Sequence, residues 1–584
     1  MPLMGSLYVG TSGLQNSQNA LNTTAHNLSN VDTVGYTRQQ VQLSDKRYLT
    51  LSVDPKSINN KQVGMGVTFS RIKQVRDYFL DKTYRKESGR SMFYEVSSEV
   101  LEEVESQLGE MNGETFQGTI EDFWSAIQEL CKDPANAVTQ GVLVQRASQF
   151  MLKAESVYNS LCSYQDNLNE KIKKYVKQIN KYGNQLLELN ESIRKIEAGG
   201  IEKANDLRDA RNQILDELAS LADIRYDEDM YGNVWVQIEG TDFVRGDICF
   251  EMDLYTDSTT GFYTPFWPIN SDYKELPDGT REYIWGRLDT VFNLDREISS
   301  DLNTDIGGLK AMLLARGDHR ANYTDIENDY DSISQSIIMN IQAEFDQLIH
   351  SVATKVNEIL ANAAGVQQLE EGSSLRVLDQ DGNVIELKNV KYCESKPGGY
   401  MRMSDGRPIQ LFGKATTEGY TKYIGEDGVT EYWVYNEEDP SQLNTLYTCG
   451  NLEVPEELMQ SPSMLGFRLP DGKEDQATAD ALKAAFKEEK YTLNPNVQKT
   501  TNFIEYYSDL VSQIGNTGWV QGSIYMNQMG TVESINNARE QVVGVSSDEE
   551  LSNMVRFQSA YNASSRYINV VSEMLEHIIN TLGV

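Results

Sequence analysis

Side chains that could carry chemistry are few and scattered in this sequence of 584 residues. It contains four histidines and five cysteines, and none of them stands in an HExxH or CxxC pattern. A zincin active site and a zinc ribbon are therefore excluded on motif grounds, and an odd number of widely spaced cysteines does not favour a disulfide framework. We expect no metal site and no cofactor, and free thiols at all five positions: Cys131, Cys162, Cys249, Cys393 and Cys449.

Two polar clusters remain to be weighed. His319 lies in the run Arg316-Gly-Asp-His-Arg320, where a histidine at a helix end on the surface is favoured over a catalytic base. The run Asp379–Asn383 hints at a calcium loop, but its glycine is fourth rather than sixth and apolar residues flank it, so a hairpin turn is predicted. No GxSxG, phosphate-binding loop or GxGxxG occurs at a strand-to-helix junction. The sequence thus predicts no catalytic residue and no enzyme.

The charge balance narrows the range of partners. The net charge of −35 argues against nucleic acid and anionic membranes, since both require a basic surface. Residues 1–50 are an exception, because two acidic and three basic side chains there sum to +1. The chain starts without the apolar core of a cleavable signal peptide, and no run approaches the ~18 apolar residues of a membrane span, so membrane insertion is not expected.

The elements that must position these residues show heptad patterns at both ends of the chain. Glycines at 5, 10 and 13 weaken the first helix in isolation, so it needs a partner. A capping-box spacing, either Ser546 with Glu549 or Ser547 with Glu550, predicts the start of the last helix. We predict that the two terminal helices pair in a coiled-coil-like bundle. Their apolar residues recur every seven positions and form the predicted assembly seam: Leu7, Leu14, Leu21, Leu28, Met554, Tyr561, Ile568, Leu575 and Leu582.

A longer helical pattern occupies the centre of the chain. Residues ~140–222 predict a helical hairpin that is interrupted near Gly199-Gly200, and helical patterns also cover 71–130, ~305–362 and ~501–540. Lys- and Glu-rich positions flank an apolar stripe, as in a coiled coil. This rod seam consists of Leu168, Ile172, Ile179, Leu186, Leu189 and Ile193.

The period of the pattern changes at about residue 224. Alternating residues around a turn at Gly232-Asn233 predict a β-hairpin, and a second β-rich stretch begins near 372. The predicted fold is therefore multidomain α+β, mainly α with two outward β-rich insertions. We assign the domains as follows: 1–40 with 541–584, a terminal helical domain; 41–223 with 305–364 and 496–540, a helical rod domain; 224–304, a β-rich domain; and 365–495, a second β-rich domain.

The turn after the first helix carries a recognisable motif. We predict that Asn30 ends the helix in the left-handed conformation and that Gly35 supplies a positive φ. The stretch Ala25–Gln39 resembles the N-terminal signature of bacterial flagellar rod, hook and hook-associated proteins, although Val34 stands where proline is common. Stretches at 205–218, 307–316 and 544–575 are similar to the hook-associated members at the hook–filament junction. The turn motif comprises Asn27, Asn30, Gly35, Tyr36 and Arg38.

The resemblance implies a structural role without a reaction. It implies an extracellular component of the bacterial flagellum, exported by the type III apparatus without a cleaved signal peptide. It also implies a helical ring of about eleven copies, with terminal helices as the inner tube and the rod around it. The implied partners are copies of the chain, the hook protein, a second hook-associated protein or flagellin on the filament side, and an export chaperone at the C-terminal helix. Low charge in residues 1–31 suits close packing of copies.

Two alternatives stay open at this point. The chain could be another flagellar axial protein, such as a hook-type subunit. It could also be a secreted adhesin or enzyme whose site lies in the β insertions, although no motif in 365–495 supports that interpretation.

Overall fold

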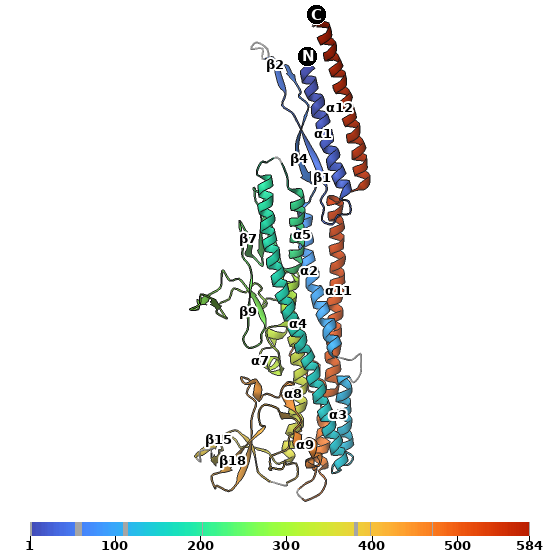
Figure 1. The fold of residues 1–584 in the computed structure, drawn as a ribbon. Helices are drawn as coiled ribbons and strands as arrows, with labels where there is room; N and C mark the ends of the chain where they lie inside the picture. Colours follow the sequence, from blue (N-terminus) through green and yellow to red (C-terminus); the bar gives the residue numbers. More distant parts are fainter. Residues whose placement is uncertain are drawn as a thin grey trace.

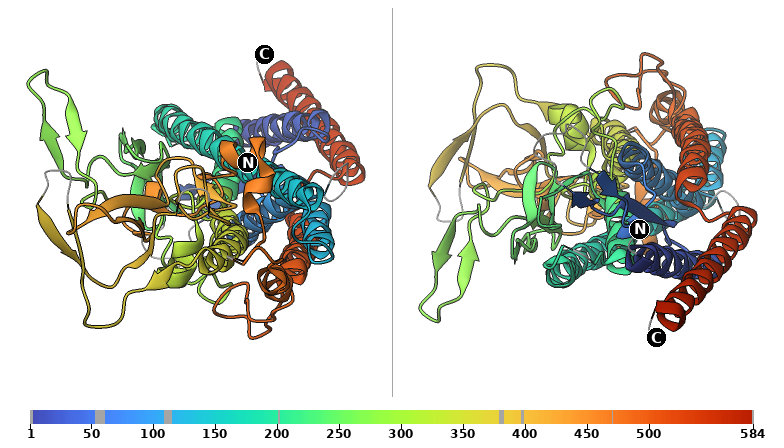
Figure 2. Two further views of the ribbon diagram at one scale, coloured as in Figure 1. Left: turned by 90° about the horizontal axis from the view of Figure 1, so that it is seen from below. Right: turned by 90° about the horizontal axis from the view of Figure 1, so that it is seen from above.

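The computed structural model describes residues 3–52, 61–108, 115–200, 202–378, 383–396, 399–469 and 471–582. The molecule is elongated, with its helices along the long axis and its β-rich parts on one side (Figure 1). The views along the axis show the β-rich parts projecting from one flank of the helices, away from the terminal pair (Figure 2). The predicted fold class, mainly α with β insertions, is confirmed.

The two ends of the chain lie together at one tip of the molecule (Figure 1). Helix α1 (Leu3–Ser29) packs against α12 (Ser547–Leu582), which confirms the predicted pairing. A ladder of β1 (Gln39–Asp45) and β4 (Val67–Gln74) lies on another side of α1 and is extended by β2 (Leu49–Ser52) and β3 (Lys61–Val63).

This ladder corrects the helical rod segment predicted from residue 41. The helical prediction for residues 71–77 is wrong, because β4 continues to Gln74 and the first rod helix begins at Tyr78. Along β4, exposed and half-buried side chains largely alternate. This alternation is expected for a strand that packs one face and exposes the other. Ile72 and Val75, interpreted as one helix face, are in fact the end of a strand and its exit.

The rod is a bundle of long helices around one apolar core. Its centre is aromatic: Phe116 packs against Phe150, Phe345 and Tyr507 with ring centroids 4.7–5.4 Å apart. Six of its helices start behind a polar residue whose side chain accepts a hydrogen bond from the first turn, as N-caps do. The rod helices are α2 (Tyr78–Leu108), α3 (Phe116–Leu130), α4 (Ala137–Glu197), α5 (Asn205–Leu221), α6 (Gly308–Arg316), α7 (Tyr323–Ile333), α8 (Ile337–Ala363) and α11 (Phe503–Val543).

The predicted rod seam lies on α4, with one difference. Leu189 is only half-buried, whereas the other five residues are buried: Leu168, Ile172, Ile179, Leu186 and Ile193. A second buried row on α4 contains Asn190 in place of the predicted Leu189. This row consists of Val176, Gly183 and Asn190. The cause is contact with the first β-rich region, since a Cβ on Gly183 would lie 2.5 Å from Phe243 Cζ. Close approach of a strand, rather than a second helix, determines this face of α4.

Asparagines on the rod helices hold the β-rich regions. The amide of Asn190 accepts from Val234 N (3.1 Å) and donates to Val234 O (2.9 Å), as a neighbouring strand would. Asn180 pairs in the same way with Met252, and Asn357 of α8 with Phe412. Asparagine is unfavourable inside a helix, so its place in an apolar stripe was a signal in the sequence for such docking.

The first β-rich region contains a four-stranded antiparallel sheet in the order β5-β6-β7-β8 and two separate hairpins. The turn predicted at Gly232-Asn233 is confirmed, because it joins β5 to β6 and Gly232 has φ 85°. The strands are β5 (Ile224–Glu228), β6 (Val234–Ile238), β7 (Thr241–Arg245), β8 (Ile248–Cys249), β9 (Asp253–Thr256), β10 (Tyr263–Phe266), β11 (Tyr273–Glu275) and β12 (Arg281–Tyr283).

The second β-rich region holds a six-stranded sheet in the order β13-β16-β19-β18-β14-β15. It also contains the helices α9 (Glu456–Gln460) and α10 (Gln476–Ala485), which the sequence patterns did not indicate. The predicted turn at 379–382 lies outside the described residues. The strands are β13 (Gln367–Gln368), β14 (Leu375–Leu378), β15 (Val384–Leu387), β16 (Lys391–Glu394), β17 (Gly413–Lys414), β18 (Tyr420–Gly425), β19 (Glu431–Tyr435) and β20 (Leu452–Glu453).

Two carboxyl groups are fully buried in α8. Glu344 accepts hydrogen bonds from Asn494 Nδ2 (2.6 Å) and Gln513 Nε2 (3.2 Å), and Asp346 accepts from the backbone N–H of Cys449 (2.6 Å). Burial raises the pKa of Glu344 to about 7 and that of Asp346 to about 6, although these hydrogen bonds oppose the rise. The rod core therefore contains carboxyl groups that titrate near neutral pH.

Replacing Glu344 with glutamine is expected to flatten the pH dependence of stability. The pKa of Glu344 is raised on folding, so its contribution to stability is complete below the unfolded value of 4.5 and is lost as pH rises through about 7. The free energy of unfolding should therefore fall between pH 5 and pH 8 by about 2–3 kcal/mol less in Glu344→Gln than in the wild type. Urea unfolding at both pH values measures this, with the exposed Glu102→Gln as control. Parallel pH profiles for wild type and Glu344→Gln would contradict the assignment.

Candidate assembly site at the junction of the terminal helices and the rod

The turn motif lies where the terminal helix pair meets the rod, between the end of α1 and β1 (Figure 1). Gly35 has φ 80°, as predicted. The left-handed conformation predicted for Asn30 is wrong, because Asn30 is not among the residues with positive φ. Its side chain closes the helix end by another route, as Nδ2 donates to the carbonyl of His26 (2.9 Å). The amide of Asn30 thus satisfies the carbonyl of His26, one of the last carbonyls of the helix, without a left-handed residue.

Asn27 is the centre of the turn and is 1% exposed. Its Oδ1 accepts from the backbone N–H of Gln39 (3.1 Å) and from the hydroxyl of Tyr36 (2.7 Å). Its Nδ2 donates to Gln39 O (2.9 Å) and to Glu550 Oε2 (3.2 Å). Every donor and acceptor of this amide is used, so no other side chain reproduces its role. Burial, and then nearby Asp209, raise the pKa of Tyr36, which keeps its hydroxyl a donor.

Arg38 joins the N-terminal segment to the start of α12. Its guanidinium contacts Glu550 through Nε and Nη2 (both 2.9 Å) and Glu549 through Nη1 (2.8 Å). The side chain of Glu550 is 3% exposed, whereas that of Glu549 is 62% exposed. Arg38 also donates its backbone N–H to Val543 O, the last residue of α11 (2.9 Å). One residue therefore ties the turn to both C-terminal helices.

Asp209 of α5 holds the same turn from the rod side. It accepts from Thr37 N (3.1 Å), Thr37 Oγ1 (2.6 Å) and Gln74 Nε2 (2.8 Å). Burial raises the pKa of Asp209, and the hydrogen bonds from Thr37 and the charge of Arg76 oppose that rise. Thr37 is fully buried, so a carboxylate, a hydroxyl and a backbone N–H form a closed contact there.

A chain of ion pairs continues from this point into the rod. Arg76 pairs with Asp81, and Arg539 of α11 contacts Asp81 (3.8 Å) and Asp216 (2.8 Å). Arg85 of α2 donates to Asp216 from the other side (2.7 Å). Helices α2, α5 and α11 are thereby joined by alternating charges that are largely buried, where breaking one pair leaves a charge uncompensated.

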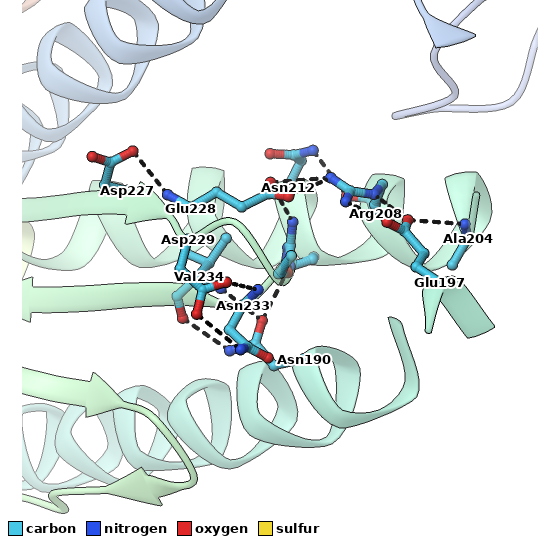
Figure 3. A network of polar contacts seen from close by, with 12 residues as sticks. Asn190, Glu197, Ala204, Arg208, Asn212, Asp227, Glu228, Asp229, Asn233 and Val234 are labelled. Atoms are coloured by element: carbon cyan, nitrogen blue, oxygen red, sulfur yellow. Dashed lines mark hydrogen bonds and ion pairs between the residues drawn. The ribbon is translucent and has the colours of Figure 1, made fainter. Parts of the chain in front are cut away.

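A second polar network joins the end of α4, the first turns of α5 and the β5-β6 hairpin (Figure 3). Arg208 donates to Glu197 (2.7 Å) and contacts Glu228 (2.8 Å), and Arg211 also reaches Glu228 (2.9 Å). Burial opposes ionisation of Glu197, but hydrogen bonds from Arg208 and Lys203 outweigh it and lower its pKa to about 2. Helix α5 therefore anchors both the turn and the first β-rich region.

The predicted assembly seam is only partly covered in the single chain. Leu582 lies outside the residues whose side chains are described, and the other eight are half-buried: Leu7, Leu14, Leu21, Leu28, Met554, Tyr561, Ile568 and Leu575. Two helices and one ladder leave other sides open, so large apolar side chains of both helices are exposed. These are Met4, Tyr8, Val555, Met574 and Ile579, at 52–67% exposure.

Glycines of α1 allow α12 to approach closely. A Cβ on Gly10 would lie 2.7 Å from Ile568 Cγ1, and one on Gly13 would lie 2.8 Å from Ser564 Oγ. From the sequence, these glycines were expected only to weaken the helix, whereas in the structure they bring α1 and α12 together. Their spacing of three on one helix face was the available signal.

Other kinds of site are not indicated in the part of the chain that the structure describes. No group of three or more His, Cys, Asp or Glu side chains there could hold a metal ion. Among the described helices, none has the length and apolar character needed to cross a membrane. His319 is bonded to Asp318 (2.6 Å) and Asp325 (3.3 Å), which raise its pKa to about 10. The five cysteines carry free thiols.

Comparison with known families matches both the ends and the rod. Residues 101–375 match the family described as flagellar hook-associated protein FlgK helical domain. Residues 7–37 match the flagella basal body rod protein family, and 541–581 match the C-terminal family of flagellar basal body rod FlgEFG proteins. The matched N-terminal stretch contains Asn27, Tyr36 and Thr37, and the C-terminal stretch contains Glu550.

Individual relatives are similar over nearly the whole chain. Flagellar hook-associated protein 1 of Bacillus subtilis (strain 168) is 23% identical over 573 residues, covering 98% of this chain and 97% of that protein. Its namesake in Salmonella typhimurium (strain LT2) is 22% identical, covering 97% and 98% respectively. The structure of the flagellar hook junction protein FlgK from Burkholderia pseudomallei is 12% identical and covers 79% of this chain and 100% of that one, with a TM-score of 0.49.

Proposed function

We propose that this chain is a member of the family of flagellar hook-associated proteins and a structural component of the flagellum that forms the junction between hook and filament. The observation that carries the proposal is similarity along 97–98% of the chain to two proteins named flagellar hook-associated protein 1. The half-covered seam of α1 and α12 supports it, because apolar surface left open in one chain is what assembly with further copies would bury.

The assembly that we propose is a helical ring of about eleven copies, built from heterologous contacts between neighbours. The terminal domain (1–40 with 541–584) forms the inner tube, the rod domain surrounds it, and the regions 224–304 and 365–495 face outward. Helix α1 carries no Asp, Glu, Lys or Arg, which allows copies of a chain with net charge −35 to pack closely there.

The proposed partners are the structures on either side of the ring and a chaperone that binds the chain before assembly. The ring contacts the hook protein on one side and a second hook-associated protein or flagellin on the other. Before assembly, an export chaperone covers the C-terminal helix, whose exposed apolar residues include Val555, Met574 and Ile579. The chain is then exported by the type III apparatus without a cleaved signal peptide and acts outside the cell, with no catalytic role.

A hook-type subunit is the second candidate, and one observation favours it. The flagellar hook protein FlgE of Treponema pallidum is 34% identical over 79 residues, although this covers only 12% of the chain.

Deletion of the gene separates the two candidates by electron microscopy. If the chain forms the junction, cells should keep their hooks, lose their filaments and release flagellin monomer into the medium. Loss of the hooks themselves would favour the second candidate. Normal filaments on the deletion strain would overturn both.

A further inference from the structure

A cavity of about 560 Å³ lies between β4, α2, the first turns of α5 and the β5-β6 hairpin. Seven basic side chains contribute to its wall and only three carboxylates do, although the chain as a whole carries −35. Five of the seven basic side chains are paired with carboxylates of the chain, among them Glu197 and Asp216 outside this wall, so the charge that would attract an anion here is that of the two unpaired residues. The cavity size is that of a site for a small ligand.

Two of the basic residues have no carboxylate partner among the residues that the structure describes. Arg71 and Lys73 are exposed and lie two apart on β4, so they are on the same face of the strand. Arg71 Nε donates to Gln42 Oε1, a neutral amide (2.9 Å). The ammonium of Lys73 has no hydrogen-bond or ion-pair partner within the described ranges. These two charges are therefore available to a ligand, whereas Arg85 and Arg208 are paired within the chain.

A buried donor in the cavity wall is also unused. Arg211 is 2% exposed, and its Nη1 donates to Asn190 Oδ1 (3.1 Å) and Gly232 O (2.6 Å) while Nη2 donates to Glu228 (2.9 Å). Its Nε–H has no acceptor in the part of the chain that the structure describes. A buried charged group with an unmade hydrogen bond is costly, and an oxygen of a bound anion would satisfy it.

The start of α5 adds backbone donors to the same wall. Lys203 and Asn205 line the cavity, and Ala204, which precedes the 17-residue helix, supplies no side-chain cap, while the carboxylate of Glu197 accepts from the backbone N–H of Ala204 itself (3.2 Å). The first N–H groups of a helix lack partners within the helix and lie at the positive end of its dipole, where phosphate and carboxylate groups bind. The uncapped helix end and the unused Arg211 donor therefore indicate the same ligand chemistry independently.

We propose that this cavity is a binding site for a ligand with two or more oxyanion groups, such as a diphosphate or a di- or tricarboxylate. Arg71 and Lys73 bind one group, while Arg211 Nε and the first turn of α5 bind another. The ligand would connect the terminal ladder, the rod and the first β-rich region, which all border the cavity. This site goes beyond the junction role and does not depend on it.

Calorimetric titration of the full chain with sodium pyrophosphate tests the proposal, with sodium chloride at matched ionic strength as the reference. Saturable binding of one pyrophosphate per chain is expected, together with a rise in Tm that grows with ligand concentration. Each of Lys73→Gln and Arg71→Gln should weaken binding by about tenfold. Both side chains are exposed, so folding should not be affected. The exposed Lys177→Gln on α4, away from the cavity, should bind like wild type.

Absence of saturable binding would overturn the proposal, and so would equal weakening in Lys177→Gln, which would indicate charge screening alone. Sedimentation of the same samples distinguishes two sources of the oxyanions. If carboxylates of a second copy occupy the cavity, pyrophosphate and Lys73→Gln should each reduce self-association. If the ligand is a free anion, self-association should not change while binding is still lost in the β4 variants.

Discussion

A leucine in place of Gly10 is expected to abolish filament growth while leaving the rod and the β-rich regions folded. The new Cβ would lie 2.7 Å from Ile568 Cγ1 and 3.1 Å from Tyr567 Cδ1, so α1 and α12 would have to separate. Overpacking of this kind costs about 1–3 kcal/mol in one chain. In the proposed ring the displacement would recur in every copy, so that ring should fail to close.

The helix propensity of leucine makes this prediction specific. Glycine lies roughly 0.8–1 kcal/mol below alanine in helix propensity and leucine ranks directly after alanine, so Gly10→Leu should stabilise α1 in isolation. Gly141→Leu is a matched control, because Gly141 also lies inside a helix but a Cβ added there would meet no atom within 4 Å. Electron microscopy of cells and swimming in soft agar measure the result. Normal filaments with Gly10→Leu would show that the close contact of α1 and α12 is dispensable.

Replacing Arg38 with methionine is expected to release the start of α12 from the turn. The carboxylate of Glu550 would stay 3% exposed with Asn27 Nδ2 as its remaining side-chain donor among the described residues. Removing one partner of a buried ion pair costs about 3–5 kcal/mol, because the other charge is left uncompensated. Hydrogen exchange in residues 547–560 should accelerate by at least about 100-fold, which corresponds to about 3 kcal/mol.

Arg566→Met is the matched control, since Arg566 is an exposed arginine of α12, the helix in which exchange is measured. It should leave exchange in residues 547–560 unchanged. A double-mutant cycle with Glu550→Gln isolates the pair, and the two changes should be strongly non-additive. Additive effects would mean that Arg38 and Glu550 stabilise the junction separately, and the ion pair would not be the link between the chain ends.

Much of the fold could be predicted from local patterns. The heptads at Leu7–Leu28 and Met554–Leu575 predicted two helices, and their apolar stripes required partners. The change of period near 224 coincides with the start of the first β-rich region, since β5 begins at Ile224. Such signals work because helix and strand repeats are expressed within a few neighbouring residues.

The β1–β4 ladder and helix α10 could not be predicted in this way. Short strands such as β2 and β3 contain too few residues to display a period. Apolar residues at Ile72 and Val75 suit a helix as well as a strand, and only packing of the ladder against α1 decides between them. The same holds for the face of α4, where Gly183 and Asn190 are buried because strands approach it.

In the candidate site, too, some features follow from the local sequence and others only from tertiary packing. The sequence by itself determined the positive φ at Gly35, the helix that ends before it and the low charge of α1, since each depends on residue type or local spacing. Only the tertiary structure decided that Glu550 is the partner of Arg38, 512 residues away, and that Asp209 holds Thr37 from α5. Among 87 acidic residues, nothing local distinguishes these two. Burial selects them, because a carboxylate removed from water must find its donors wherever the packed chain brings them.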